Sequence, residues 1–188
     1  MRRSHMRDAE LAALAQAGDR DAFGELVTRY AAQARRVARA ILGNQDDADD
    51  AAQDGFLAAL RHLGRYDPTR PFGPWLIRIV ANAATDRRRR MRVRAAEPLG
   101  PKLSSGETTP DSAVDRTAFL RVLEEGLEKL PERQRIAVVL FDVEGYSHRE
   151  IAEVLDVPEG TVRSDVFHAR RALREALAPW RDWKQEIL

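Results

Sequence analysis

The sequence predicts an all-α protein of two small helical domains joined by a flexible linker, the second domain being a helix-turn-helix. Three observations predict this class. Apolar residues recur at helical spacing along most of the 188 residues, and no segment shows a convincing strand pattern. Residues 94–115 are instead rich in Pro, Gly, Ser and Thr, which is typical of a linker. Close to the C-terminal end, two helical patterns follow one another with almost nothing between them.

Two helices are expected at the start of the chain. The first covers residues 8–17 and is broken at Gly18. The second carries a long apolar stripe that stops near Gly43, because glycine commonly ends a helix. The stripe consists of Phe23, Leu26, Val27, Tyr30, Ala34, Val37, Ala38 and Ile41.

The next two helices differ strongly in charge. A helix is expected over residues 46–63, and its first half falls in an acidic block (44–54) that holds five Asp and no basic residue. After a loop, a second helix is expected from about residue 74 to 92, and the block 85–94 holds six Arg against one Asp. The formal net charge of +1 hides this segregation. Opposite charges in separate blocks predict two different partner surfaces, one of them suited to nucleic acid.

Helices resume after the linker, near Thr117. Pro131 is expected to start a helix that ends at Gly145, and its apolar side consists of Ile136, Val139, Leu140 and Val143. A short helix follows, because Ser147 and Glu150 form a capping box. Tyr146 and Ile151 stand where a hydrophobic staple would place them, and the apolar stripe of this helix is Ile151, Ala152, Val154 and Leu155.

The last helix pairs one apolar stripe with a polar and basic face. Pro158 suits its first position, since proline lacks the N–H that would have no partner there. The stripe is Val162, Val166, Ala169 and Leu173. At about 100° per residue, the opposite face holds Gly160, Thr161, Ser164, Phe167, His168 and Arg171, flanked by Arg163, Arg170 and Arg174. Such a face suits a helix in a DNA major groove. A helical hairpin with a solvated basic face is the alternative.

The composition argues against several other classes. The chain has no Cys, so it has no disulfide framework and no thiolate metal site. Its histidines (His5, His62, His148 and His168) have no metal-ligand spacing, and no Gly-rich phosphate loop is present. We therefore expect no enzyme, no cofactor and no metal. No apolar run approaches the ~20 residues of a membrane span and no signal peptide is visible, which predicts a cytoplasmic protein without membrane insertion.

Four motifs carry a resemblance to a known family. They are "DADDAAQDGFLAAL", "RPFGPWLIRIVANAATDRRRR", "LEKLPERQRIAVVL" and "YSHREIAEVLDVPEGTVRS". In order and spacing the chain resembles the extracytoplasmic-function (ECF) group of the sigma-70 family of RNA polymerase sigma factors, over nearly its whole length. The resemblance implies a sigma-2 domain (8–93), a linker (94–115), a sigma-4 domain (116–178) and a C-terminal tail (179–188).

The resemblance also implies a function and partners. An ECF-type sigma factor binds core RNA polymerase and directs promoter-specific initiation by recognising the minus-ten and minus-thirty-five elements and opening the strands. The implied partners are core RNA polymerase, through its β′ clamp and β flap, promoter DNA and a cognate anti-sigma factor. The alternative is a helix-turn-helix repressor or activator that is not a polymerase subunit. It would need a dimer interface and a ligand pocket, and the sequence shows no coiled-coil heptads and no obvious pocket.

The acidic helix is the expected docking site for core polymerase. About 140° from its apolar stripe (Ala48, Ala52, Gly55, Phe56, Ala59 and Leu63) lies a second face. That face carries the expected polymerase-binding residues Asp50, Gln53, Asp54, Leu57 and Arg61. In the family this helix binds the β′ clamp. The alternative is a solvated face with one stray leucine, since single exposed apolar residues are common.

The loop of residues 64–73 and the helix after it carry the expected minus-ten contacts. These are Tyr66, Phe72, Trp75, Arg78, Asn82, Asp86 and Arg89. Aromatic faces can stack an unpaired base and nearby arginines can hold phosphates, and Asn82 stands where the family reads a base. The alternatives are that Phe72 and Trp75 belong to the core and that Arg87 to Arg90 form a solvated helix end.

The final helix carries the expected minus-thirty-five contacts, which are Thr161, Arg163, Ser164, Phe167, His168, Arg170 and Arg171. It departs from the family pattern at Asp165, Val166 and Phe167, where basic or histidine-containing residues are common. We expect Asp165 to repel phosphate and Phe167 to pack on a thymine methyl or on the polymerase. The departure means that a promoter preference cannot be transferred from the family.

Overall fold

The computed structural model describes residues 3–95 and 114–180, and every regular element within them is helical. The N-terminal half (residues 3–95) contains α1 (Asp8–Gln16), α2 (Arg20–Leu42), α3 (Gln45–His62) and α4 (Phe72–Ala95), with short 3-10 turns at Arg3–His5 and Leu63–Arg65. The C-terminal half (residues 114–180) contains α5 (Val114–Lys129), α6 (Glu132–Val138), the π-helical turn η3 (Val139–Val143), α7 (His148–Leu155), α8 (Glu159–Ala176) and the 3-10 turn Ala178–Trp180.

Local signals fix the ends of the N-terminal helices. The side chain of Asp19 caps α2 by accepting from the N–H groups of Asp21 and Ala22. Gly43 ends α2 as expected, with a φ of 83° that glycine adopts without strain. Asn44 then caps α3. The fourth helix begins at Phe72, two residues earlier than expected.

The helices α2, α3 and α4 pack around one apolar interior, with α1 against α2. The largest fully buried side chains of this half are Leu11, Leu26, Val37, Ile41, Leu76, Ile77 and Val80. At the crossing of α3 and α4, a Cβ on Gly55 would lie 2.7 Å from Cγ2 of Val80. Gly55 therefore permits the two helices to approach closely, and this places the acidic helix directly beside the basic one.

In the C-terminal half, α6 packs on α8 and α7 closes the helix-turn-helix. The single helix expected from Pro131 to Gly145 is divided into α6 and the π-helical turn η3, and Gly145, with a φ of 72°, ends it as expected. Pro158 occupies the N-cap of α8 rather than its first helical position. Asp156 makes the turn between α7 and α8 in the left-handed region, with a φ of 56°.

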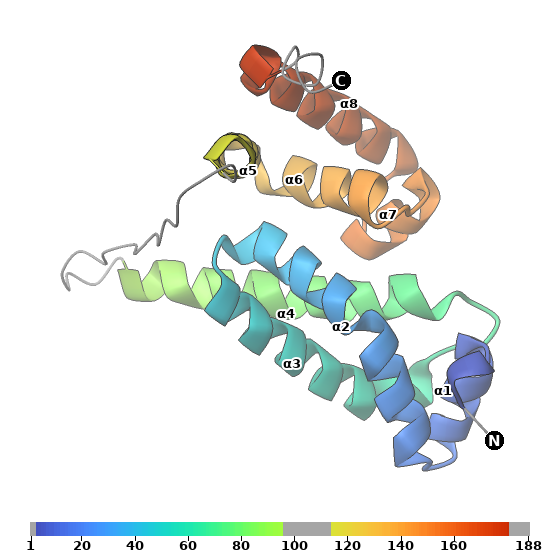
Figure 1. Cartoon of the computed structure of the whole chain (residues 1–188). Coiled ribbons are helices and arrows are strands. Elements are labelled where there is room, and N and C mark those ends of the chain that lie inside the picture. Colours follow the sequence, from blue (N-terminus) through green and yellow to red (C-terminus); the bar gives the residue numbers. More distant parts are fainter. Residues whose placement is uncertain (1–2, 96–113, 181–188) are drawn as a thin grey trace.

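The two halves pack against each other through a shared apolar core. Figure 1 shows α1–α4 on one side, α8 on the far side, and α6 and α7 between them. The contact is made by α7 on α4 and by α6 on α2, and buried residues of both halves belong to one cluster. The expected linker lies mostly outside the described residues, as do tail residues 181–188. The expected pair of domains is thus seen as one packed body.

Candidate nucleic-acid and polymerase interfaces

The helix-turn-helix begins with the expected capping box. The hydroxyl of Ser147 accepts from the N–H of Glu150, and the carboxylate of Glu150 accepts from the N–H of Ser147 at 2.9 Å. Tyr146 and Ile151 are both buried, at the two positions of the expected staple. These local interactions fix the start of α7 and therefore the position of the turn that leads into α8.

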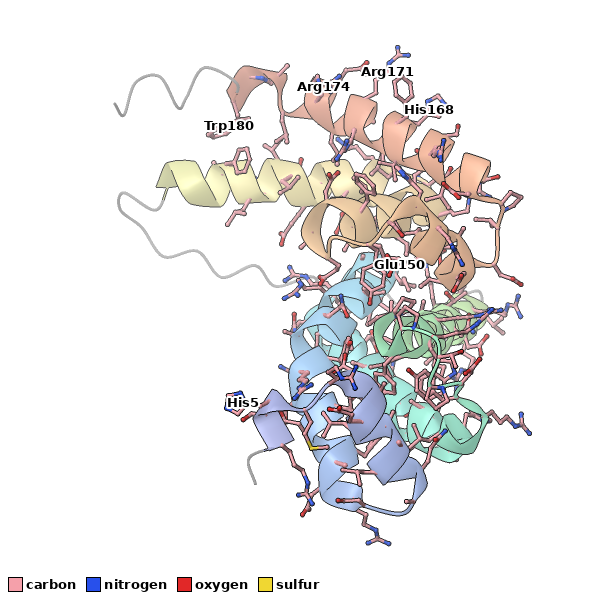
Figure 2. All side chains as sticks on the ribbon, turned by 90° about the vertical axis from the view of Figure 1, so that its right-hand side faces the viewer. His5, Glu150, His168, Arg171, Arg174 and Trp180 are labelled. Atoms are coloured by element: carbon pink, nitrogen blue, oxygen red, sulfur yellow. The ribbon has the colours of Figure 1, made fainter. Side chains whose placement is uncertain are left out.

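The outer face of α8 is exposed to solvent. The stripe that packs inward contains Val162, Val166 and Ala169, as the sequence predicted. The opposite positions Ser164, Phe167, His168 and Arg171 follow one another at helical spacing and are all exposed. Phe167 is 63% exposed and offers an apolar contact on this face. Figure 2 shows His168, Arg171 and Arg174 pointing away from the rest of the molecule. This face combines polar, apolar and cationic groups, as a major-groove reader requires.

Three of the four arginines of α8 fall into two groups. Arg163 and Arg171 pair with Glu159 and Glu175 on their own helix, one turn away, with Arg side chains 68% and 66% exposed. Such exposed pairs are weak, so a phosphate or a base can replace the carboxylate. Arg170 instead pairs with Asp142, and its guanidinium carbon lies 4.9 Å from the centre of the Phe141 ring. Arg170 is therefore directed toward η3, at the side of the recognition face.

The expectation that Asp165 repels phosphate is wrong. Asp165 is 4% exposed and its Oδ2 accepts from Nε of Arg133 at 2.5 Å. The carboxylate faces α6 rather than the solvent, and it ties α8 to that helix. A signal for this was present in the sequence, because Asp165 follows Val162 by three residues and precedes Ala169 by four, and so lies within the apolar stripe.

Two of the three aromatics expected to stack bases are in the core. Tyr66 and Phe72 are 3% and 2% exposed, and their ring centres lie 5.2 Å apart in an edge-to-face contact. The hydroxyl of Tyr66 donates to the carbonyl oxygen of Arg70 at 2.6 Å. The expectation that Tyr66 and Phe72 present free faces is therefore wrong, because the loop turns both rings inward against Trp75, and Phe72 also packs on Tyr30. Trp75 is only partly buried.

A cleft of about 770 Å³ separates this loop from the helix-turn-helix. Trp75 and Arg78 line one wall, and Asp156, Val157 and Glu159 belong to the other. Nη2 of Arg78 lies 3.6 Å from Oδ1 of Asp156 across the cleft. The turn between α7 and α8 therefore stands opposite the residues expected to hold the minus-ten strand.

The other expected minus-ten residues on α4 are exposed. Asn82 and Asp86 line a hollow of about 390 Å³, together with Asp54 and Arg61 of α3. Arg89 lies on the same helix and is exposed. The hollow thus brings residues expected to read DNA beside residues expected to contact polymerase, which places the two functions side by side on adjoining helices.

The expected docking face on α3 is accessible. Leu57 is 48% exposed, and Gln53, Asp54 and Arg61 are exposed as well. Asp50 is exposed but paired, since its Oδ2 accepts from Nη2 of Arg87 at 2.7 Å. Arg87 also pairs with Asp47, with side chains 28% and 24% exposed. The expected acidic and basic blocks are therefore joined at this point, and they form adjoining surfaces rather than separate ones.

The fold and these faces define the chain as a DNA-binding transcription protein. It has a capped helix-turn-helix whose recognition face is exposed, polar and basic. It also has a second basic helix, which begins beside an aromatic loop.

Comparison with known proteins identifies the family. Residues 26–94 match the sigma-70 region 2 model and residues 120–173 match the sigma-70 region 4 model. The ECF RNA polymerase sigma factor SigM of Mycobacterium tuberculosis is 40% identical over 178 residues, covering 93% of this chain and 87% of that protein. SigW of Bacillus subtilis is 31% identical over 170 residues, covering 85% and 91%. The chain belongs to the ECF sigma factors of the sigma-70 family, which direct promoter-specific transcription by RNA polymerase.

Solved structures share this fold. CnrH, in complex with the cytosolic domain of CnrY, aligns with a TM-score of 0.67 and 32% identity, covering 92% of this chain and 97% of that one. RpoE of Bartonella quintana, in complex with the anti-sigma factor NepR, aligns with a TM-score of 0.71 and 23% identity, covering 83% and 96%. Within residues 3–95 and 114–180, no helix is long and apolar enough to cross a membrane. In those same ranges no group of three or more His, Cys, Asp or Glu side chains could hold a metal ion.

Proposed function

We propose that this sigma factor works through three exposed surfaces, two of which adjoin on α3 and α4. The outer face of α8 contacts the minus-thirty-five element, the exposed side of α4 from Trp75 to Arg89 contacts the minus-ten strand, and the exposed face of α3 docks on the β′ clamp of core polymerase. We assign one contact to each surface because each of them carries polar or charged side chains that the shared core leaves exposed. In domain terms, residues 8–93 form the sigma-2 domain, 94–115 the linker, 116–178 the sigma-4 domain and 179–188 the tail.

The observation that carries the proposal is the open stripe on α8. Four exposed side chains follow one another along it, and they offer a hydroxyl, an apolar ring, an imidazole and a guanidinium. A helix of this composition can read base edges, while the flanking arginines hold the phosphates. The proposed contacts are Thr161, Arg163, Ser164, Phe167, His168 and Arg171, with Arg170 at the side.

For the minus-ten strand, Trp75 is the aromatic candidate, because its ring is only partly covered and borders the cleft. Arg78 and Arg89 supply charge for phosphates, and Asn82 and Asp86 supply hydrogen-bonding groups. Tyr66 and Phe72 support this surface from within by packing against Trp75.

The docking face on α3 combines one apolar anchor with polar neighbours. Leu57 is the anchor, and Asp50, Gln53, Asp54 and Arg61 surround it. Interfaces commonly concentrate their binding energy in such a central side chain, with charges at the rim. The sigma-4 domain adds a contact with the β flap.

We also infer a protein partner that controls the chain. CnrH was solved with the cytosolic domain of CnrY, and RpoE of Bartonella quintana with the anti-sigma factor NepR. The likeness of this chain to CnrH in sequence and fold supports a cognate anti-sigma factor. The chain itself has no catalytic role in this proposal, and as a polymerase subunit it works in the cytoplasm.

Run-off transcription tests the proposal. The protein is added to sigma-free core polymerase with a library of genomic promoter fragments. We expect discrete transcripts that start at defined sites and that depend on the protein. The proposal fails if no such transcripts appear while the isolated protein binds duplex DNA tightly and specifically, since that combination identifies a repressor or activator.

A further inference from the structure

The recognition helix α8 carries arginines on only one of its two flanks. At about 100° per residue, Arg163, Arg170 and Arg174 lie on one side of the exposed stripe that runs through Ser164 and Arg171. The flank on the other side of the stripe carries no arginine or lysine of α8. Its residues are Thr161, Asp165 and Ala172.

This asymmetry matters for DNA binding. A helix that lies in the major groove has a phosphate backbone on each side of it. Contacts with these two backbones fix the orientation of the helix and supply much of its affinity. By itself, the arginine-free flank of α8 would offer one of the backbones only the negative charge of Asp165.

The missing cation comes from α6. Nε and Nη2 of Arg133 donate to the two carboxylate oxygens of Asp165, at 2.5 and 3.3 Å. The side chain of Asp165 is 6% exposed, whereas that of Arg133 is 53% exposed. Among the described residues no acceptor is bound to Nη1 of Arg133, so its two N–H groups remain available. The flank therefore presents a half-exposed guanidinium to the solvent in place of a carboxylate.

The other flank has the reverse arrangement. There the arginine, Arg170, belongs to α8, and the carboxylate of Asp142 belongs to η3, with side chains 47% and 35% exposed. In both pairs the guanidinium is the more exposed member. The helix α6, which packs against α8 (Figure 1), continues directly into η3. This one segment thus supplies a guanidinium to one flank of α8 and a carboxylate to the other.

A purely structural role does not account well for a charged pair between α6 and α8. Removing two charges from water is costly, and well-packed apolar side chains commonly hold two helices together at least as firmly as a buried ion pair. What the ion pair adds is a cation in a fixed direction. A guanidinium is planar, so binding one carboxylate through Nε and Nη2 leaves Nη1 for a second oxyanion.

We propose, on the basis of the proposed function of α8, that Arg133 contacts a backbone phosphate of the minus-thirty-five element. Asp165 is then a positioning residue, which holds Arg133 beside the recognition face. The two backbones that border the groove are held by Arg163 and Arg170 on one flank and by Arg133 on the other. Because phosphates are the same in every sequence, Arg133 adds affinity and orientation but no base preference.

The salt dependence of promoter binding tests the proposal. The holoenzyme, formed with the full chain, is titrated against a fluorescein-labelled promoter fragment taken from the run-off assay, and fluorescence anisotropy is read at several salt concentrations. The test variant combines Arg133→Gln with Asp165→Asn, so no buried carboxylate is left unpaired. The matched control combines Arg121→Gln with Glu125→Gln, which removes a pair on α5 at 3.7 Å. Both variants keep the net charge of the wild type.

The test variant should lose one phosphate contact. The slope of log affinity against log salt concentration should therefore be smaller by about 1 than in the wild type. Between about 50 and 200 mM salt, the affinity of the wild type should fall about three- to fourfold more than that of the test variant. The loss should be the same on fragments that differ in the minus-thirty-five sequence. The control should match the wild type, and equal slopes for all three proteins would overturn the proposal.

Neutral phosphates give a second readout. Single methylphosphonates are placed one at a time along both strands of the minus-thirty-five element. One of these positions should weaken binding by the wild type and the control but not by the test variant, because its phosphate has already lost its partner. A test variant that stays sensitive at every position where the wild type is sensitive would refute the contact.

A second variant guards against a folding defect. Arg133→Met with Asp165→Leu replaces the ion pair by apolar side chains, which commonly keeps or raises stability. Its melting curve should resemble that of the wild type, and its salt slope should be reduced like that of the first variant. A folded protein of this kind with the wild-type slope would also overturn the proposal.

These outcomes are separable from the proposed function. Promoter-dependent run-off by the wild type, combined with equal salt slopes, rejects only the role of Arg133 and Asp165. Absence of promoter-dependent run-off rejects the function itself.

Discussion

The two basic helices of this protein, α8 and α4, differ in what surrounds their arginines. On α8, Arg163 and Arg171 pair with carboxylates of their own helix and stay about two-thirds exposed. On α4, Arg87 and Arg88 pair with other elements and are 28% and 24% exposed. Arginines thus form an open face on α8, whereas on α4 the pair Arg87 and Arg88 forms a covered face beside arginines that stay exposed, such as Arg78 and Arg89. The lesson is that a run of arginines indicates positive charge, while packing decides whether that charge is available.

This difference predicts two kinds of mutational effect. Changes on the covered face and its supporting core should alter the free energy of unfolding, because they disturb contacts already made in the free protein. Changes on the open faces of α8 and α3 should alter binding and leave folding intact. The following variants test the division, from the largest expected effect to the smallest.

Phe72→Ala should lower the free energy of unfolding by about 3–5 kcal/mol, because it empties a buried aromatic position. Chemical denaturation followed by circular dichroism measures this. Trp75→Ala is the matched control: its ring is only partly buried, so it should cost less stability but impair strand opening in a permanganate footprint. A Phe72→Ala protein as stable as wild type would show that the Phe72 ring is not part of the core.

Leu57→Arg should weaken binding to core polymerase by about 2 kcal/mol or more, the usual cost of losing a central anchor. The thermal midpoint should hardly change, because the side chain is already half exposed. Leu60→Arg is the control, since Leu57 and Leu60 lie on the same helix and are 48% and 47% exposed. A pull-down with core polymerase separates them, and retained binding by folded Leu57→Arg would refute the docking assignment.

Arg171→Ala should cost the holoenzyme about 1–3 kcal/mol in promoter affinity and relax specificity at one position of the minus-thirty-five element. Arg121→Ala is the matched control, because Arg121 also pairs with a glutamate one turn away and is 75% exposed. Gel-shift titrations at physiological salt provide the measurement. Identical affinities for both variants would remove Arg171 from the recognition face.

Tyr146→Phe should have the smallest effect, about 0.5–1.5 kcal/mol in the free energy of unfolding, because it removes one hydrogen bond between the halves. The Tyr146 hydroxyl donates this bond, and burial raises its pKa further above the neutral range. Tyr30→Phe loses a comparable bond to Asp8 within one half. Both variants should be less stable, but only Tyr146→Phe should reduce energy transfer between two dyes, one attached at Thr28→Cys in the N-terminal half and one at Ala172→Cys in the C-terminal half.

The sequence by itself determined the features that depend on neighbours along the chain. The capping box at Ser147 and the helix end at Gly43 are set within a few residues, so local chemistry was sufficient to predict them. Helical periodicity also predicted the inward stripe of α8 and the exposure of Leu57, because one buried stripe fixes the orientation of a whole helix.

Only the tertiary structure decided which residues a distant segment covers. Tyr66 and Phe72 lie in or next to a loop, where no periodicity indicates a direction, and the approach of α1, α2 and α4 encloses them. The partners of Arg88 and Glu144 are 44 and 108 residues away in the sequence, at positions that carry no local signal. Periodicity in the sequence predicts one buried face of a helix. The helices α4 and α7 each pack against more than one other helix, and these additional contacts form only when the whole chain folds.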